Sequence, residues 1–245
     1  MSKADLHIHT TYSWDGMMTP AAALKAAHMA GLDVIAITDH DEINGAFEAL
    51  DLAGKYGLEV IPGIEITTTD GHLLALFVHQ LIPAGLPLIE TLLRIGAQGG
   101  LAIAPHPLAP MTHSLGSRPI CAALSHPEAR QVLVGMEVFN GGLPYRRSNL
   151  GARVLADSLP VAQVGSSDAH IFWSVGIGGT EFPGRTAADF RRALIDRKTY
   201  ALTLPGIFAA KNLVGWILHY GLKRAGWVMS NPQPHLPLVL ARFSQ

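Results

Sequence analysis

The sequence predicts an α/β protein whose mostly parallel sheet closes into a barrel. Seven short apolar segments with strand character alternate along the chain with segments of helical periodicity. Residues of the types that bind metals, chiefly histidines, gather at the ends of these strand segments. A length of 245 residues suffices for one large α/β domain or two small ones with a sizeable core.

The strand segments are bounded by turn residues and by helical stretches. Thr19 is expected to cap a helix over 21–30, because Thr suits the N-cap and Pro20 suits the first turn. Thr186 and Asp189 form a variant of the capping box, which predicts a helix from there to about 197. The expected strands are 4–9, 33–38, 58–64, 72–79, 101–104, 132–139 and 161–165, and the other expected helices are 45–56, 87–98, 145–157 and a short one near 121–131 within a long loop.

The composition indicates a compact, rather apolar protein and argues against some classes of partner. The apolar fraction is 49%, the charged fraction is 15% and the formal net charge is −1, with no long run of Lys or Arg. The basic surface of a protein that binds long nucleic acids is therefore not expected. A small anionic substrate remains compatible, because a bound metal supplies local positive charge that the net charge does not reveal.

The cysteine content and the first residues of the sequence indicate the cellular compartment of the protein. Cys121 is the single cysteine, so an internal disulfide is excluded and a reducing compartment is favoured. The first residues lead directly into a polar strand without the apolar stretch of a secretory signal. We therefore expect a cytoplasmic protein.

Residues 205–245 differ from the rest and are expected to form a helical extension of a domain that covers residues 1–204. The pattern over 207–228 is helical and apolar, but Lys211, Lys223 and Arg224 leave the uncharged run too short for a transmembrane span. We expect this helix to pack on the barrel or on a partner chain, as in a homo-oligomer. Contact with a membrane surface is the alternative.

The first sixteen residues contain the first candidate metal ligands. His7 and His9 lie two residues apart in the first strand, where they and Asp5 are expected to share a face. Two neutral imidazoles so placed can bind one metal ion, and Asp15 follows as an oxygen ligand. Taken alone, this pair is a weak signal, because a buried strand can also carry two histidines.

The other strand ends strengthen the hypothesis of a metal site. His40 follows the second strand, and Glu65 follows the third. His106 follows the fifth, and Asp168 and His170 follow the seventh. His72 stands instead at the start of the fourth strand, with His79 as a rival at its other end. Because barrel enzymes place their active sites at the carboxyl ends of the strands, these side chains are expected to meet there.

Six short motifs resemble those of the PHP (polymerase and histidinol phosphatase) family, in the family's order and over about residues 4–170. They are Asp5-Leu6-His7-Ile8-His9-Thr10, Ser13-Trp14-Asp15-Gly16, Ile37-Thr38-Asp39-His40, Pro62-Gly63-Ile64-Glu65, Pro105-His106-Pro107 and Ser167-Asp168-Ala169-His170. The resemblance implies a distorted (β/α)7 barrel with two or three divalent metal ions at its mouth. By the same resemblance, the first ion would be held by His7, His9, Glu65 and Asp168, the second by Asp15, His40 and His170, and the third by Glu65, His72 and His106, with Glu65 bridging.

The donor types bear on the metal and on catalysis. Many family members have His where this chain has Asp15, and an oxygen ligand there favours Mn²⁺ or Fe²⁺ over Zn²⁺. We expect Asp168, His170 and Arg118 to serve catalysis, with Arg118 binding substrate phosphate and with Arg146 and Arg147 as further candidates. Asp5 and Asp39 are expected at strand ends or turns, with orientation of ligand imidazoles as the alternative.

The resemblance implies a metal-dependent phosphoesterase that hydrolyses a small phosphomonoester with metal-activated water. A nucleotide, a compound like histidinol phosphate and another phosphorylated metabolite are all compatible substrates. The alternative is a non-catalytic metal-binding PHP module that acts in protein interaction. A degenerate module would have lost ligands, whereas all nine positions hold competent residue types, which favours the enzyme.

Overall fold

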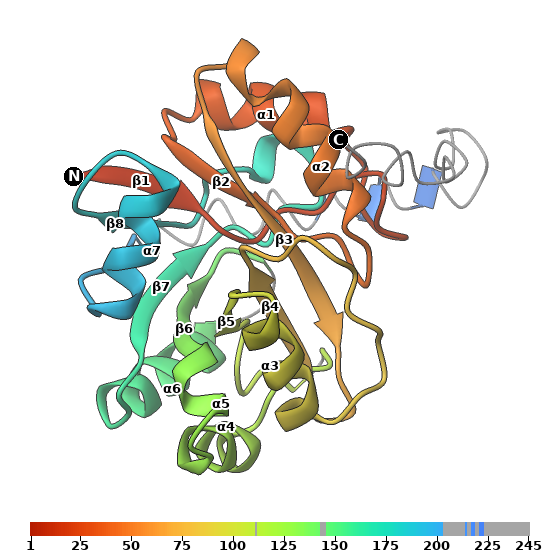
Figure 1. Cartoon of the computed structure of the whole chain (residues 1–245). Coiled ribbons are helices and arrows are strands. Elements are labelled where there is room, and N and C mark those ends of the chain that lie inside the picture. Colours follow the sequence, from red (N-terminus) through yellow and green to blue (C-terminus); the bar gives the residue numbers. More distant parts are fainter. Residues whose placement is uncertain (111, 143–145, 203–213, 215–216, 219–220, 223–245) are drawn as a thin grey trace, which may run out of the picture.

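The computed structural model of the chain shows a mixed α/β fold in which helices surround one strongly curved sheet (Figure 1). It describes the chain except for residues 111, 143–145, 203–213, 215–216, 219–220 and 223–245. The helices are α1 (Pro20–Met29), α2 (Asn44–Leu52), α3 (Leu88–Ala97), α4 (Ser117–Ser125), α5 (Ala129–Val132), α6 (Arg146–Asp157) and α7 (Ala187–Ile195). The strands are β1 (Ser2–Asp5), β2 (Val34–Ile37), β3 (Glu59–Thr67), β4 (His72–Leu76), β5 (Leu101–Ala104), β6 (Leu133–Asn140), β7 (Ala162–Ser166), β8 (Gly179–Phe182) and β9 (Tyr200–Leu202).

The sheet is nearly closed, as the barrel prediction requires. Its order is β7-β6-β5-β4-β3-β2-β1-β8-β9. The sheet closes where β7, at one end of this order, meets β8 near the other end. There, the backbone N–H of Gly165 donates to Thr180 Oγ1 at 3.0 Å, and Thr180 Oγ1 donates to the Gly165 carbonyl oxygen at 2.8 Å. A Cβ at residue 165 would lie 2.5 Å from the carbonyl oxygen of Gly179, so this approach needs glycine. The predicted barrel fold is thus confirmed, with β8 and β9 as strands that the sequence did not predict.

The expectation of a mostly parallel sheet is wrong in two regions, because β8 runs antiparallel to both β1 and β9 and β4 is also reversed. Strand β4 runs antiparallel to both β3 and β5, while the β1–β2, β2–β3, β5–β6 and β6–β7 pairs are parallel. Only residues 68–71 connect β3 to β4, and a parallel crossover needs a dozen residues or more. Thr68 holds this turn: its Oγ1 accepts from the N–H of Gly71 at 3.1 Å.

The first strand also departs from its prediction. Strand β1 ends at Asp5 rather than at residue 9, and regular pairing stops there. Leu6 packs with β2 residue Ala36 in one core cluster, whereas Ile8 packs with Ile35 and Ile37 in another. Strict alternation along one strand would place Leu6 and Ile8 on the same face, but the two residues pack in different clusters.

Local signals predicted the helices well. Thr19 caps α1 by accepting the N–H of Ala22 at 3.2 Å, and Thr186 and Asp189 form the reciprocal capping box of α7. The expected short helix near 121–131 is instead two helices, α4 and α5. Most of the predicted helix over 207–228 lies outside the described residues, so the extension over 205–245 stays a prediction.

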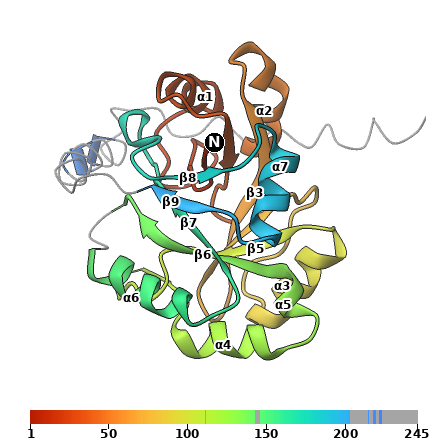
Figure 2. The same cartoon turned by 90° about the vertical axis from the view of Figure 1, so that its left-hand side faces the viewer.

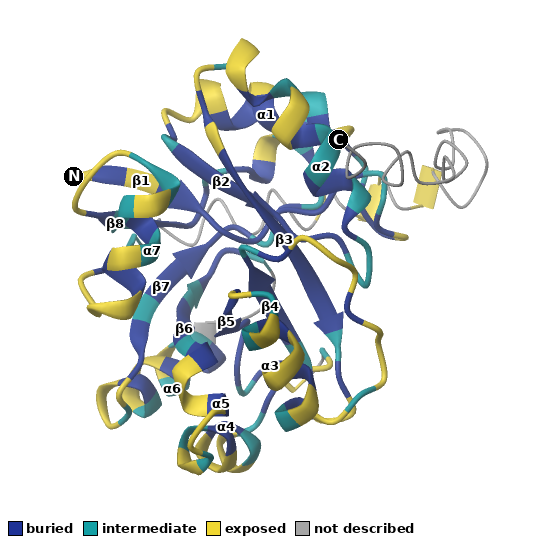
Figure 3. Cartoon of the chain, viewed as in Figure 1, coloured by how far each residue is buried: buried dark blue, intermediate teal, exposed yellow. Residues whose placement is uncertain are grey.

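Helix α7 lies at the end of the barrel where the parallel strands begin (Figure 2). Its first N–H, on Ala187, bonds Glu59 at the start of β3, and Arg191 donates to the carbonyl oxygen of Gly99, just before β5. Phe190 packs edge-on against Phe182, with ring centroids 5.1 Å apart, and both are fully buried. The strands are buried almost throughout, while the helices expose their outer faces (Figure 3). In the described part of the chain, no helix combines the length and the apolar character that crossing a membrane requires.

Candidate metal centre

All nine predicted ligands lie together at the end of the barrel opposite α7. The antiparallel direction of β4 explains why His72 joins them although it begins its strand: the first residue of β4 lies beside Thr67, the last residue of β3. The ligand-type atoms form four overlapping groups, and within each group these atoms lie within 4.8 Å of one another. The groups are His9, Asp15, His40 and His170; His7, Glu65 and His106; His7, His9 and Asp168; and His40, Glu65 and His72.

Glu65 lies at the centre of the cluster. Its Oε2 is 3.1 Å from His7 Nε2, 3.3 Å from His9 Nε2 and 3.3 Å from His40 Nδ1. Its Oε1 is 3.0 Å from His72 Nδ1 and 3.1 Å from His106 Nε2. The two oxygens thus face different imidazoles, which is the arrangement that a bridging carboxylate requires.

The two aspartates flank this centre on separate sides. Asp15 Oδ2 lies 2.9 Å from His170 Nε2 and 3.5 Å from His40 Nε2. Asp168 Oδ1 lies 3.4 Å from His9 Nε2 and 3.5 Å from His7 Nε2. His9 therefore stands between the aspartates and is shared by two of the groups.

The charges of the cluster shift the pKa values of its members strongly. Burial alone lowers the pKa of His7, but the carboxylates of Asp168 and Glu65 raise it well above its ordinary value. Burial likewise lowers the pKa of His9, and the same two carboxylates raise it to about 10. Burial raises the pKa of Glu65, but nearby imidazoles, chiefly that of His7, bring it well below its usual range. Protons on imidazoles therefore balance the buried carboxylates, and a metal cation would take their place.

Individual atoms of the cluster also fit metal binding. His9 Nε2 and Asp15 Oδ1 are buried and make no hydrogen bond. Buried polar atoms that make no hydrogen bond are rare, because each costs roughly 1–3 kcal/mol. Both atoms belong to the group of His9, Asp15, His40 and His170, whose imidazole and carboxylate donors suit Mn²⁺, Fe²⁺ or Zn²⁺. The residues present thus fit a divalent metal ion.

Four of the six non-glycine residues with positive φ in the described part of the chain lie at the same end of the barrel, and the other two, Phe77 and Arg197, follow β4 and α7. Two of the clustered residues have positive φ, at 28° for His106 and 53° for Asp168, and so do Asp41 at 51° and Leu108 at 66° beside them in sequence. Such conformations cost of order 1–3 kcal/mol each and collect at functional sites. The strain therefore agrees with a functional role for this end.

The remaining predicted residues lie outside the cluster. His79, the rival of His72, is exposed beyond the far end of β4. Arg118 is exposed in the first turn of α4, and no hydrogen bond or ion pair among the described residues joins it to the cluster. Arg147 is exposed on α6, and the side chain of Arg146 lies outside the described part of the chain. The phosphate-binding role of these arginines stays a prediction.

Asp5 and Asp39 occupy the strand-end positions expected for them. Asp5 accepts backbone N–H groups of Ser167 at 3.0 Å and Gly176 at 2.9 Å. Asp39 accepts the backbone N–H and the hydroxyl of Thr10. Both carboxylates therefore tie loops together, and neither has an imidazole among its hydrogen-bond partners.

Three residues that support the cluster were missed by the sequence analysis. Ser13 Oγ lies 3.1 Å from His9 Nδ1 and accepts the backbone N–H of His40 at 2.8 Å. Ser114 Oγ lies 2.7 Å from His106 Nδ1. Glu137 Oε1 lies 3.1 Å from His7 Nδ1. Glu137 carried a usable signal, because it is the one charged residue in an apolar strand segment. Ser13 stands in one of the six motifs but without an assigned role, and Ser114 carried no signal.

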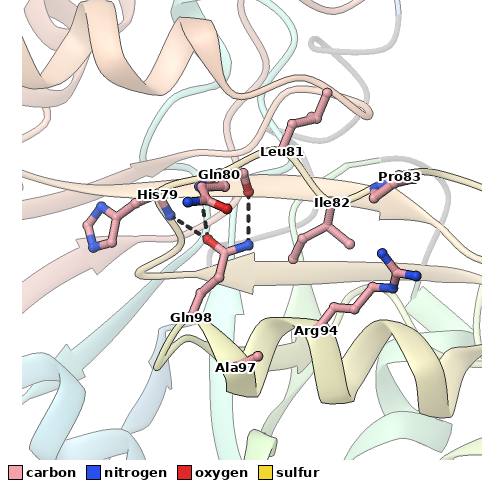
Figure 4. Close-up of a pocket in the computed structure, with 8 residues that line it drawn as sticks. All are labelled: His79, Gln80, Leu81, Ile82, Pro83, Arg94, Ala97 and Gln98. Atoms are coloured by element: carbon pink, nitrogen blue, oxygen red, sulfur yellow. Dashed lines mark hydrogen bonds between the residues drawn. The ribbon is translucent and has the colours of Figure 1, made fainter. Parts of the chain in front are cut away.

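A separate pocket lies at the far end of β4, beyond the strand's last residue (Figure 4). It encloses about 450 Å³ and is lined by His79, Gln80, Leu81, Ile82, Pro83, Arg94, Ala97 and Gln98. The Gln98 amide is occupied there, because its oxygen accepts the N–H groups of His79 and Gln80 and its nitrogen donates to the Gln80 carbonyl oxygen. None of the nine clustered residues lines this pocket, so it is distinct from the candidate metal centre.

Comparisons with known proteins agree with the cluster and with the fold. The family model described as the PHP domain matches residues 5–112, and the PHP-associated model matches residues 146–199. The chain is 44% identical over 148 residues to the uncharacterized Methanocaldococcus jannaschii protein MJ1587, covering 56% of this chain and 81% of that protein. It is 32% identical over 88 residues to a 3',5'-nucleoside bisphosphate phosphatase of Chromobacterium violaceum, covering 34% of this chain and 30% of that enzyme.

A solved structure shares the fold. It is that of a two-domain protein from Bacteroides vulgatus described as containing a PHP-like metal-dependent phosphoesterase. The TM-score is 0.64 at 22% identity, and the match covers 82% of this chain and 64% of that protein.

Proposed function

The chain belongs to the PHP family, and on that premise we propose that it is a metal-dependent phosphoesterase that hydrolyses a small phosphomonoester. The observation that carries the proposal is the cluster of nine imidazole and carboxylate side chains around Glu65. A purely structural role does not account for so many buried ionisable groups at one point, since each group is costly to bury without a partner.

The residues divide into ligands and supports. His7, His9, Glu65 and Asp168 would hold one ion, Asp15, His40 and His170 a second, and Glu65, His72 and His106 a third. Two or three divalent ions held there would supply Lewis-acid chemistry: activation of water as the nucleophile and neutralisation of charge on the phosphoryl oxygens. Ser13 supports the ligands by contacting the His9 ring and the His40 backbone.

The rim of the site favours a substrate that carries a planar ring. Trp14 precedes Asp15, its indole stacks on the His40 ring at a centroid distance of 5.9 Å, and 64% of the residue remains exposed. Exposed indole surface beside a phosphate-binding site can stack on a flat ring. Among the relatives, the Chromobacterium violaceum enzyme is named for a nucleoside bisphosphate substrate. A compound like histidinol phosphate also carries a planar ring, so it is the relative's substrate that makes a nucleotide our first choice, ahead of that compound or another phosphorylated metabolite.

A non-catalytic PHP module that binds metal and acts in protein interaction is the second candidate. Such a module would differ from the enzyme in having lost residues that bind metal. This chain has competent side chains at all nine clustered positions. The retained set favours the enzyme.

The test combines metal content with turnover. Protein purified without chelator is analysed for metals, and p-nitrophenyl phosphate hydrolysis is measured before and after chelation and after addition of Mn²⁺. We expect bound metal, loss of activity on chelation and recovery with Mn²⁺. His7→Ala and Asp168→Ala should remove activity, while Asp189→Ala, which changes only the capping box of α7, should retain it. Loaded metal without turnover of any phosphoester tested would favour the non-catalytic module.

A further inference from the structure

Glu137 is a buried carboxylate of β6 whose contacts reach two of the predicted metal ligands. The residue has no exposed surface. Its Oε1 lies 3.1 Å from His7 Nδ1, and its Oε2 accepts the backbone N–H of His106 at 2.7 Å. Oε2 also accepts from Asn140 Nδ2 at 2.8 Å. One side chain thus joins the segments that follow β1 and β5 to β6 itself.

An irregularity in β6 brings this side chain and Asn140 together. Glu137 pairs with Val164 and Phe139 pairs with Gly165, so β6 contains one residue more than β7 over this step. Residues 137 and 140 are an odd number apart, and a regular strand would place them on opposite faces. An extra residue in one strand reverses that alternation, and such bulges re-aim side chains next to active sites. The bulge explains how Glu137 and Asn140 can share a hydrogen bond.

The partners of Glu137 Oε2 require an acceptor at that oxygen. The backbone N–H of His106 and the amide nitrogen of Asn140 can only donate, and both point to Oε2. An ionised Glu137 can only accept at Oε1, and we therefore assign the proton of this contact to Nδ1 of His7. The Nε2 atom of the same ring faces Glu65 Oε2 at 3.1 Å and Asp168 Oδ1 at 3.5 Å. Glu137 therefore directs Nε2 of His7 toward the centre of the cluster.

We propose that Glu137 is a positioning residue of the metal centre, which fixes the Nδ1–H tautomer and the orientation of His7 and, with its other oxygen, the backbone of His106. This inference rests on the metal centre that the proposed function requires. Residues that hold a ligand histidine through its second nitrogen typically change metal affinity by about 10- to 100-fold when replaced.

A purely structural role for Glu137 has different consequences. Loss of a buried acceptor would then lower the stability of the fold but leave the metal affinity of the folded protein unchanged. Glu137→Gln separates the two roles, because it keeps the volume and one acceptor oxygen but replaces the other by an NH₂ group that faces donors. Asp189→Ala serves as the matched control, since it also removes a hydrogen-bonding carboxylate but lies in the capping box of α7.

The experiment measures Mn²⁺ binding by isothermal titration calorimetry of the full chain for the wild type, Glu137→Gln, Glu137→Ala and Asp189→Ala. Thermal unfolding of each metal-free variant is recorded in parallel. We expect the affinity of the tightest site to fall about 10- to 100-fold in both Glu137 variants, while Asp189→Ala binds as the wild type does although its unfolding temperature is lower.

A spectroscopic measurement reports on the tautomer directly. In the Zn²⁺-loaded wild type, ¹⁵N NMR of labelled histidines should show His7 protonated at Nδ1, and Glu137→Gln should lose this defined state. Wild-type affinity and an unchanged His7 spectrum in Glu137→Gln would overturn the positioning role while leaving the metal centre intact. A wild-type chain that binds neither Mn²⁺ nor Zn²⁺ would overturn both this inference and the proposed function.

Discussion

The two ends of the barrel differ in what they contribute to the protein. At the α7 end, Phe190 and Phe182 pack in a fully apolar environment, and the capping box satisfies the first turn of the helix. At the opposite end, nine ionisable side chains crowd together, and two of their buried atoms make no hydrogen bond. One end of the barrel therefore stabilises the fold through apolar packing, whereas the other holds a cluster of buried charged groups that is costly to fold without bound cations.

The largest effect on stability is expected from Phe190→Ala at the apolar end. The change removes a fully buried aromatic side chain and should lower the free energy of unfolding by about 3–5 kcal/mol. Urea denaturation of the metal-free protein measures this loss. Metal content per folded chain should equal that of the wild type, and a parallel loss of metal would show that the two ends are not independent.

Glu65→Gln should have the converse effect at the polar end. Glu65 contacts five imidazoles, so we expect Mn²⁺ affinity to fall by more than about 100-fold, beyond the range typical of supporting residues. Calorimetric titration measures the change, with Glu90→Gln on the exposed face of α3 as the control of the same chemistry. Wild-type affinity in Glu65→Gln would remove Glu65 from the predicted ligands.

Acidification should weaken metal binding at the polar end alone. Because the carboxylates raise the pKa of His7 and His9, a metal ion must displace protons from them near neutral pH. Each displaced proton makes the apparent Kd rise about tenfold per unit fall in pH. Titrations in buffers with different ionisation enthalpies should detect the released protons. Binding that releases none would contradict the proton balance described for the cluster.

The raised pKa of His9 also predicts how the stability of the metal-free protein changes at alkaline pH. The folded pKa of His9 is about 10 against an ordinary 6.5, so its stabilising contribution is complete below about pH 6.5 and is lost as the pH rises toward 10. The unfolding free energy of metal-free protein should therefore decrease over this range. Metal-loaded protein should not show this decrease, because the metal has replaced the protons.

The smallest effect is expected at the rim of the polar end. Trp14→Ala should raise the KM for a nucleotide about threefold to tenfold, which corresponds to a lost ring contact of roughly 0.5–1.5 kcal/mol. The KM for glycerol phosphate, which has no ring, serves as the internal control. Equal changes for both substrates would assign Trp14 a structural role in the loop before Asp15.

The sequence indicated which side chains would lie together better than it indicated the directions of the strands. Eight of the nine clustered residues stand in the six motifs. His72 stands in none of them and begins its strand, yet it lies with the others. The short connection before His72 contained the needed signal, because four residues permit a hairpin and no crossover. Strands β2 and β5 are equally short but wholly apolar, whereas β8 contains Thr180 and Glu181 and β9 has only three residues, so neither gave a continuous apolar run to detect.

The sequence by itself determined the features that depend on neighbours along the chain: the caps of α1 and α7, the alternation of strands and helices, and the presence of the ligand-type side chains. Only the tertiary structure decided the closure of β7 against β8, the bulge at Glu137 and the grouping of the ligands. Caps and periodicity depend on contacts within a few residues. Strand pairing and register depend on contacts such as that between His7 and Glu137, which lie 130 residues apart and meet only when the barrel closes.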